Sequence, residues 1–96
     1  MEVLGKDNLV EFMEVHGSAK LQLLSWLKEI TNNSWSNIGD IKNKYVSVDI
    51  LPNDKVLFHC IKGEFKLLAY VCCINGIVVI EKIGTIADYG KWNINR

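Results

Sequence analysis

Residues 64–83 read EFKLLAYVCCINGIVVIEKI, two apolar runs joined by Asn75 and Gly76. Asn-Gly between apolar runs is the strongest short-range signal for a β-hairpin, because both residues accept the left-handed backbone of a tight turn. The stretch is also too short and too interrupted to be a membrane-spanning helix, which needs about 20 apolar residues. It therefore predicts two antiparallel strands.

Two further strands are expected just before this hairpin. VSVDIL (46–51) alternates apolar and polar residues, and KVLFHCI (55–61) is a second run rich in β-branched and aromatic residues. The turn residues Pro-Asn-Asp at 52–54 separate these runs, and Lys-Gly at 62–63 separates the second run from the hairpin. Together the four runs predict an antiparallel meander.

The first half of the chain reads as helix. Asp7 is the expected cap of a first helix that ends near Val15, with Leu9, Phe12 and Met13 on one face. Ser18 is the expected cap of a second helix that ends near Thr31. Its apolar stripe consists of Leu23, Trp26, Leu27 and Ile30. Ser34 is the expected cap of a short third helix that contains Trp35, Ile38 and Ile41.

Both ends of the chain add short elements to this pattern. MEVLG (1–5) can form a short edge strand, and a short helix is expected from about Ala87. The fold class is therefore α+β, with N-terminal helices packed on an antiparallel meander sheet and a short C-terminal helix. Residues 1–96 are expected to form a single domain.

Composition excludes several classes of protein. Lys plus Arg and Asp plus Glu are 11 each, so the chain is not broadly basic and RNA binding needs a local patch. The N-terminus has acidic residues and no long apolar run, which predicts a cytoplasmic protein without a signal peptide or a membrane association. Three cysteines, with Cys72 and Cys73 adjacent, form neither a disulfide framework nor a zinc spacing, so no metal or other cofactor is expected.

Two-residue turns at 75–76 and 62–63 would fix the register of the sheet. His59 would then face Lys66, and Lys66 would face Thr85. The same register pairs Ile61 with Glu64, Phe58 with Leu67, Tyr70 with Glu81, and Val71 with Ile80. His59, Lys66 and Thr85 would form a polar row across three strands on the face away from the helices, unless the row is only a solvated sheet face.

Three stretches resemble the RelE superfamily of bacterial toxins, and more narrowly its HigB-like branch. SWSNIGDIKNKYVSVD (34–49) resembles the family's Trp-x-x-Phe/Ile-x-Asp-Val/Ile-Lys segment. VLFHCIKGEFKLL (56–68) resembles its central hairpin, and GTIADYGKW (84–92) resembles its Gly-Thr-His-x-Glu-Tyr-Asp-Lys motif. The order and spacing of the three stretches carry the resemblance over nearly the whole chain.

The resemblance implies a toxin of a two-gene toxin–antitoxin module that cleaves messenger RNA on the ribosome and is bound by a cognate antitoxin. The implied chemistry is metal-independent attack by a ribose 2′-hydroxyl on the adjacent phosphate, which needs a proton acceptor, a cation and a proton donor. The oligomeric state is left open.

The chain departs from the family pattern where this chemistry would occur. The family histidine is replaced by Ile86, which carries no proton, and the family arginine by Lys66, which keeps only the charge. One hypothesis is a relocated catalytic site, with His59 as acid or base, Lys66 on the phosphate, and Tyr89 as second proton carrier or stacking partner. The alternative is a catalytically inactive RelE-fold binding module that acts through a protein partner.

Other polar residues near these positions are candidates for RNA binding. They are Lys62, Lys82, Thr85, Asp88 and Lys91. The lysines can equally be scattered and solvated, and Asp88 can equally cap the last helix. For the binding-module alternative, we expect an apolar patch around Leu57, Leu68 and Ile83 on the same face.

Overall fold

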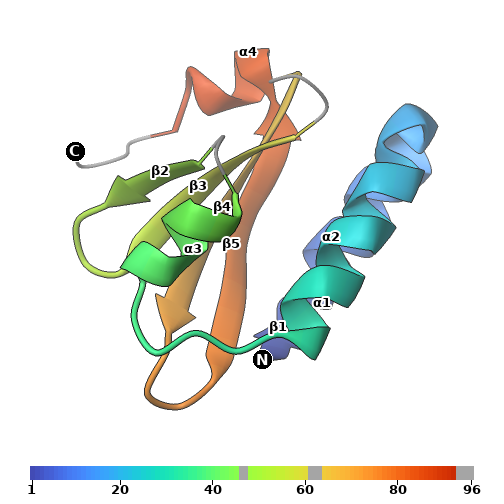
Figure 1. Ribbon diagram of the computed structural model, residues 1–96. Helices are drawn as coiled ribbons and strands as arrows, with labels where there is room; N and C mark the ends of the chain where they lie inside the picture. The colour runs from blue at the N-terminus through green and yellow to red at the C-terminus, as the bar shows by residue number, and fades with distance from the viewer. Residues whose placement is uncertain (46–47, 61–63, 93–96) are drawn as a thin grey trace.

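The fold is a sheet with a layer of helices on one face (Figure 1), as seen in a computed structural model that describes residues 1–45, 48–60 and 64–92. The elements are, in chain order, β1 (Glu2–Leu4), α1 (Lys6–Val15), a 3-10 turn (Gly17–Ala19), α2 (Lys20–Asn32), α3 (Gly39–Lys44), β2 (Val48–Leu51), β3 (Lys55–Cys60), β4 (Phe65–Cys72), β5 (Ile77–Thr85) and α4 (Ile86–Tyr89). This order confirms the predicted α+β class.

The five strands form one mixed sheet in the order β1-β5-β4-β3-β2. Strands β2 to β5 are the predicted antiparallel meander, and the N-terminal strand β1 adds a parallel edge beside β5. No helix in the described part of the chain is both long and apolar enough to cross a membrane.

Helices α1, α2 and α3 cover one face of the sheet. Their inward residues include Leu9, Leu23 and Ile41, which pack with Val56 and Phe58 of β3 in one buried cluster. The cluster forms because the helical spacing of apolar residues and the two-residue alternation of the strands each place one apolar side toward the other layer. The side chains of β3 and β4 that alternate with this set point away from the helices.

The expected helix caps are wrong, although the helices are where the sequence predicts them. The cap residue of α1 is Gly5 in left-handed backbone (φ 83°), and a Cβ there would lie 2.7 Å from the Ile80 carbonyl oxygen. Asp7 is inside the first turn, and Ser18 is inside the 3-10 turn that leads into α2 without a side-chain cap. Close approach to β5 and continuous backbone hydrogen bonding replace the side-chain caps at these two positions.

The third helix is shorter than expected. It begins at Gly39 rather than after Ser34, so of its expected apolar residues only Ile41 is helical. Trp35 and Ile38 precede the helix but still pack against the main core. The apolar pattern therefore reports burial correctly, while the conformation of residues 34–38 differs from the helix that it predicts.

The register of β3 with β4 is confirmed, because His59 pairs with Lys66 and Phe58 pairs with Leu67. The expected pair of Ile61 with Glu64, the turn at 62–63, and the first two residues of the 46–51 run involve positions outside the described residues.

The expected register of β4 with β5 is wrong. Strand β4 ends at Cys72 and β5 begins at Ile77, so four residues connect them, and Gly76 takes the left-handed backbone (φ 66°). Val71 consequently pairs with Val78 and Tyr70 with Val79. The shift is by two residues, an even number, so Val71, Val78 and Ile80 still lie on the helix face of the sheet.

A β-bulge then reverses the face of the sheet to which each residue in the last part of β5 points. Ala69 pairs with Ile80 but Leu68 pairs with Lys82, which leaves Glu81 as the extra residue. Beyond the bulge, Lys66 pairs with Gly84 rather than Thr85. Ile83 therefore packs with the helix-side core, so its expected place on the other face is also wrong.

Candidate active site

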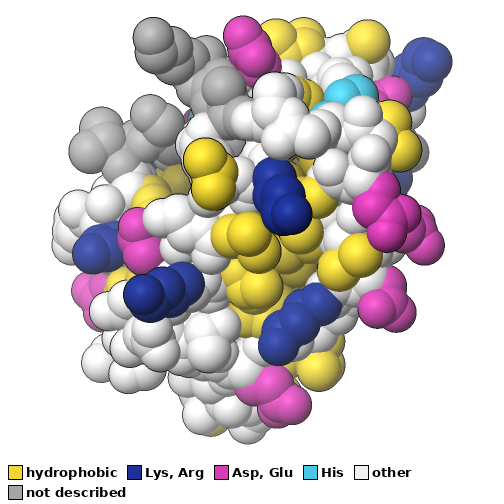
Figure 2. Space-filling view, turned by 90° about the vertical axis from the view of Figure 1, so that its right-hand side faces the viewer, with side chains coloured by type: hydrophobic (Ala, Val, Ile, Leu, Met, Phe, Trp, Pro, Cys, Tyr) yellow, Lys and Arg dark blue, Asp and Glu magenta, His cyan; other side chains and the backbone are white. Residues whose placement is uncertain are grey.

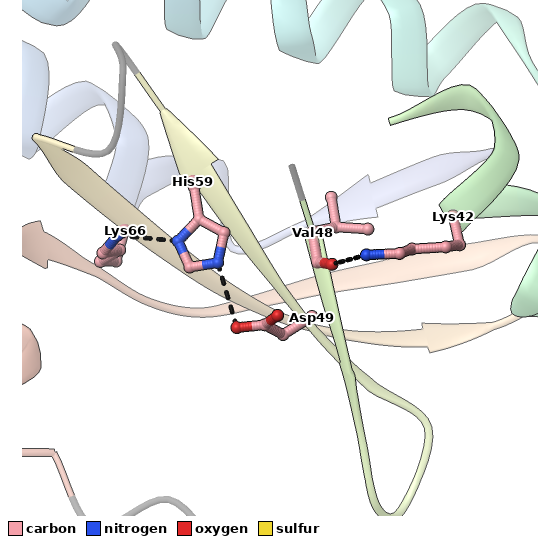
Figure 3. A network of polar contacts seen from close by, with 5 residues as sticks. All are labelled: Lys42, Val48, Asp49, His59 and Lys66. Atoms are coloured by element: carbon pink, nitrogen blue, oxygen red, sulfur yellow. Dashed lines mark hydrogen bonds and ion pairs between the residues drawn. The ribbon is translucent and has the colours of Figure 1, made fainter. Parts of the chain in front are cut away.

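Lys66 and His59 form the centre of the polar face of the sheet. They are direct neighbours across β3 and β4, and the Lys66 Nζ lies 2.8 Å from His59 Nδ1. A lysine ammonium can only donate hydrogen bonds, so His59 Nδ1 is the acceptor in this contact. Figure 3 shows both side chains directed toward each other on the side of the sheet opposite the helices.

Asp49 extends this contact onto the edge strand. It pairs with Leu57 of β3, two residues from His59 on the same face, and its Oδ2 lies 3.1 Å from His59 Nε2 (Figure 3). A carboxylate accepts hydrogen bonds, so the two contacts together assign the imidazole proton to Nε2. Lys66, His59 and Asp49 thus form a continuous hydrogen-bonded chain across three strands.

Asp49 belongs to the candidate site but is not among the site residues predicted from the sequence. The sequence does contain evidence for its position. Successive residues of VSVDIL point to different faces of the sheet, so Asp49 points away from the core face to which Val48 belongs. Combining that alternation with the register of the 52–54 turn would have placed Asp49 on the same face as His59.

The strand that carries Asp49 is fastened to the helix layer by Lys42. The Lys42 Nζ donates to the Val48 carbonyl oxygen at 2.7 Å, from α3 to the start of β2 (Figure 3). Beside this contact lies an open hollow of about 460 Å³. Its lining residues are Lys42, Val48, Asp49, Ile50, Leu51 and Pro52. Asp49 therefore contacts His59 and also lines this hollow in the surface.

Tyr89 approaches the site from α4. The Lys66 Nζ lies 5.9 Å from the centroid of the Tyr89 ring, within the range of a cation–π interaction. The three residues expected to be catalytic, His59, Lys66 and Tyr89, are consequently brought together, with Lys66 between the other two.

The capping of α4 positions Tyr89. The Thr85 hydroxyl accepts from the Asp88 backbone N–H at 3.2 Å, and the Asp88 carboxylate accepts from the Thr85 backbone N–H at 3.0 Å. This reciprocal capping box satisfies two helix-end donors. Hydrogen bonding to Thr85, first of all from its backbone N–H and then through its side chain, holds the pKa of Asp88 below its usual range. Thr85 does not belong to the predicted polar row. Because of the bulge in β5, Gly84 rather than Thr85 pairs with Lys66.

Gly84 makes room for α4 to fold back over the sheet. A Cβ at this position would lie 2.6 Å from the Asp88 Cβ and 3.1 Å from the Trp92 ring. Real Cβ atoms do not approach other atoms as closely as the first of these distances. A side chain at 84 would therefore push α4, and Tyr89 with it, away from Lys66.

An apolar cluster lies beneath this end of the site. Leu51, Leu57 and Leu68 are buried there, and Tyr89 and Trp92 pack against them. The expected exposed patch around Leu57, Leu68 and Ile83 is therefore wrong, because two of these residues are covered and the third lies on the other face. The cluster supports the Tyr89 ring from below.

The remaining candidate residues lie around the site rather than within it. The Lys82 Nζ lies 5.9 Å from the centroid of the Trp92 ring, and Lys91 is exposed just after α4. Ile86, at the position of the family histidine, is exposed at the start of α4. Lys62 lies outside the described residues.

Comparison with known proteins gives one family. The family model HigB_toxin, described as the RelE-like toxic component of a toxin–antitoxin system, matches residues 19–92. This range contains every residue of the site described above. No curated protein matches the chain.

Proposed function

The chain belongs to the HigB toxin family of RelE-like toxic components of toxin–antitoxin systems, and from this premise we propose that it cleaves messenger RNA through Lys66, His59 and Tyr89. Membership of the family implies an antitoxin as its protein partner. The proposal is that the site has moved from the family histidine position, now Ile86, to the pair formed by β3 and β4.

The observation that carries the proposal is the contact of 2.8 Å between Lys66 Nζ and His59 Nδ1. A cation and a proton acceptor that touch on this half-buried sheet face are two of the three groups that 2′-hydroxyl attack on a phosphate requires. The Lys66 ammonium binds the phosphate oxygens and stabilises the extra negative charge of the transition state. His59 accepts the proton of the attacking 2′-hydroxyl.

Tyr89 completes the proposed site as a stacking surface or proton donor. Its ring already lies over the Lys66 ammonium and rests on the buried leucines of the sheet. A supported aromatic ring beside a cation is a suitable surface for an unpaired base. Attack by the 2′-hydroxyl would form a cyclic phosphate and release the 5′-oxygen, which takes a proton from Tyr89 or from water.

Positive side chains around the site would guide the RNA. Lys82, Lys91 and Lys62 are proposed phosphate contacts, while Thr85 and Asp88 act on RNA binding through the placement of α4. Because the whole chain has a net charge of zero, this local group must supply the attraction for phosphate. We propose the ribosome as the place of cleavage, where the message is held as a single strand in the cytoplasm.

The test is induction of the full chain in bacterial cells that lack a partner gene, with RNA 5′ ends mapped in the same cells. We expect growth arrest and new 5′ ends inside translated messages for the wild type, and loss of both for His59→Ala. Lys6→Met is the control, since Lys6 is an exposed lysine at the start of α1, where a cation contributes nothing favourable. Cleavage that survives His59→Ala would overturn the role of His59.

The alternative of a catalytically inactive binding module is favoured by one different observation. Val10, Leu21 and Leu24 are exposed on the outer side of α1 and α2, and Leu21 is 84% accessible. Figure 2 shows hydrophobic side chains gathered at the centre of this face, with charged groups around them. Normal growth and unchanged RNA, with folded protein present, would favour this function.

A further inference from the structure

His59 has both ring nitrogens engaged in the structure. Nδ1 accepts from the Lys66 ammonium at 2.8 Å, and Nε2 lies 3.1 Å from the Asp49 carboxylate. Of the two tautomers of a neutral imidazole, only the one protonated at Nε2 satisfies both contacts, because the ammonium has no lone pair to offer and the ionised carboxylate has no proton. Lys66 and Asp49 therefore both favour the tautomer of His59 that is protonated at Nε2.

We propose that Asp49 is a positioning residue that fixes His59 as the Nε2–H tautomer and thereby directs the basic nitrogen, Nδ1, toward Lys66 and the substrate. The inference rests on the proposed function for its catalytic consequence, but the tautomer itself does not depend on that function. Asp49 touches no substrate atom in this account and acts only through His59.

The fold explains why Asp49 can hold this position. Asp49 comes from the edge strand β2, which pairs with β3 along its full length from Val48 to Leu51. The start of β2 is tied to α3 through Lys42, and its end is anchored by the buried Leu51. The side chain of His59 is 23% accessible and that of Asp49 is 50% accessible, so the acid is the more exposed member of the pair.

In the free protein Lys66 occupies the lone pair that the substrate needs. When RNA binds, the lysine ammonium turns to the phosphate, and Nδ1 becomes available to the 2′-hydroxyl. The proton leaves the 2′-oxygen for Nδ1 as that oxygen bonds to phosphorus and the bond from phosphorus to the 5′-oxygen breaks. The imidazolium that forms is then balanced by the adjacent Asp49 carboxylate.

The first measurement is the ¹⁵N spectrum of the histidine rings of the full chain, at a pH where the rings are neutral. The chain has two histidines, so His16 serves as an internal reference and His59→Gln assigns the signals. Because Lys66 alone also favours the Nε2–H tautomer, the effect of Asp49 is measured in the Lys66→Met background. We expect a protonated Nε2 and an unprotonated Nδ1 for His59 in the wild type and in Lys66→Met, and a mixture of the two tautomers when Asp49→Ala is added to Lys66→Met. A protonated Nδ1 in the wild type, or the same spectrum for Lys66→Met with and without Asp49→Ala, would overturn the inference.

The second measurement is RNA cleavage by the same variants. Loss of an acid–base contribution predicts that kcat falls at least about tenfold in Asp49→Ala, with little change in KM. Asp49→Asn keeps the shape and an acceptor but loses the charge, so its kcat should also fall while the fold is preserved. Glu2→Ala is the matched control, because it removes an exposed acid from the opposite edge strand.

The outcomes separate the inference from the function on which it rests. Full kcat in both Asp49 variants would overturn the positioning role even if the wild type cleaves RNA. A wild type that cleaves no RNA would overturn the proposed function, while the ring spectrum would still decide whether Asp49 fixes the tautomer of His59.

Discussion

At the scale of single residues, Gly84 sets how closely α4 can pack against the sheet beside the candidate site. It is buried on the polar face beside Lys82, and the space that its missing side chain leaves is taken by Asp88 and Trp92. Its importance comes from close packing, since its backbone has no left-handed φ. Gly84 allows α4 to pack closely against β5, and Gly5 allows the same close packing at the start of α1.

Gly84→Ala is expected to destabilise the fold and to separate Tyr89 from Lys66. Overpacking of this kind costs about 1–3 kcal/mol of the free energy of unfolding. Urea denaturation measures the loss, and chemical shifts of the Tyr89 ring report its displacement. Gly17→Ala is the control, because a Cβ at Gly17 meets nothing within 4 Å. Equal stability of the two variants would contradict this account of Gly84.

Asp88 gives α4 a predictable dependence on pH. Its pKa is lowered by hydrogen bonding to Thr85, chiefly from the Thr85 backbone N–H, so the folded state favours the ionised carboxylate. A carboxyl with a lowered pKa contributes stability above its unfolded pKa and loses that contribution as the pH falls through the folded value. The cap of α4 should therefore persist to a lower pH than the ordinary pKa of aspartate would allow, and open as the pH falls through the lowered pKa of Asp88.

An NMR titration of the Asp88 carboxyl carbon tests this pH dependence. We expect the Thr85 amide signal to follow the titration of Asp88, and Thr85→Ala to raise the pKa of Asp88 toward its ordinary value. A Thr85 amide that does not respond when Asp88 titrates would show that the capping box is absent in solution.

At the scale of the elements, the centre of β3 and β4 is buried on both faces. The helices cover Val56 and Phe58 on one side, while Tyr89 and Trp92 cover Leu57 and Leu68 on the other. Antiparallel sheets often leave one face to solvent, and the sequence predicts such an open polar face here. The four-residue helix α4 and the residues after it close part of this face instead.

Leu57→Ala should therefore cost as much as a substitution in the main core. Leu57 is fully buried, and truncation of a buried leucine costs about 2–5 kcal/mol. Ile50→Ala, at a neighbouring position that is 40% accessible, should cost much less. Urea denaturation of both variants compares them, and a loss for Leu57→Ala no larger than for Ile50→Ala would mean that this face is open.

The sequence was sufficient for the order of elements and for one hairpin, and it failed where geometry depends on backbone detail. The pair of His59 with Lys66 follows from alternation and a short turn. The pair of Lys66 with Gly84 depends on a four-residue connection and on a bulge at Glu81. Neither feature can be predicted from the pattern of hydrophobic residues. Alternation kept the core residues on the correct face because the error in the turn was an even number of residues.

The site was predictable only in part for the same reason. His59, Lys66 and Tyr89 could be proposed from register and resemblance, whereas Thr85 was assigned to the wrong face. Asp49 was missed because an aspartate in a short edge strand reads as an ordinary solvent-facing residue. Its role becomes visible only when β2 and β3 are aligned and its carboxylate is found beside the imidazole.

At the scale of the whole molecule, the fold separates two surfaces. The face of the sheet opposite the helices carries the hydrogen-bonded side chains of Asp49, His59 and Lys66. The Tyr89 ring lies beside Lys66 on this face. The helix layer carries exposed aliphatic side chains on α1 and α2 (Figure 2). The proposed RNA site and the proposed protein-binding surface therefore lie on different faces of the molecule.

The most direct test of the proposed RNA site is cleavage of a defined message in a translation reaction assembled from purified components. The full chain, Lys66→Met and Lys6→Met would be added at equal concentration, and the RNA 5′ ends would be mapped. The account predicts equal cleavage by the wild type and Lys6→Met, and a loss of at least about 100-fold in Lys66→Met, since the cation stabilises the transition state. Unreduced cleavage by Lys66→Met, or no cleavage by the wild type, would contradict it.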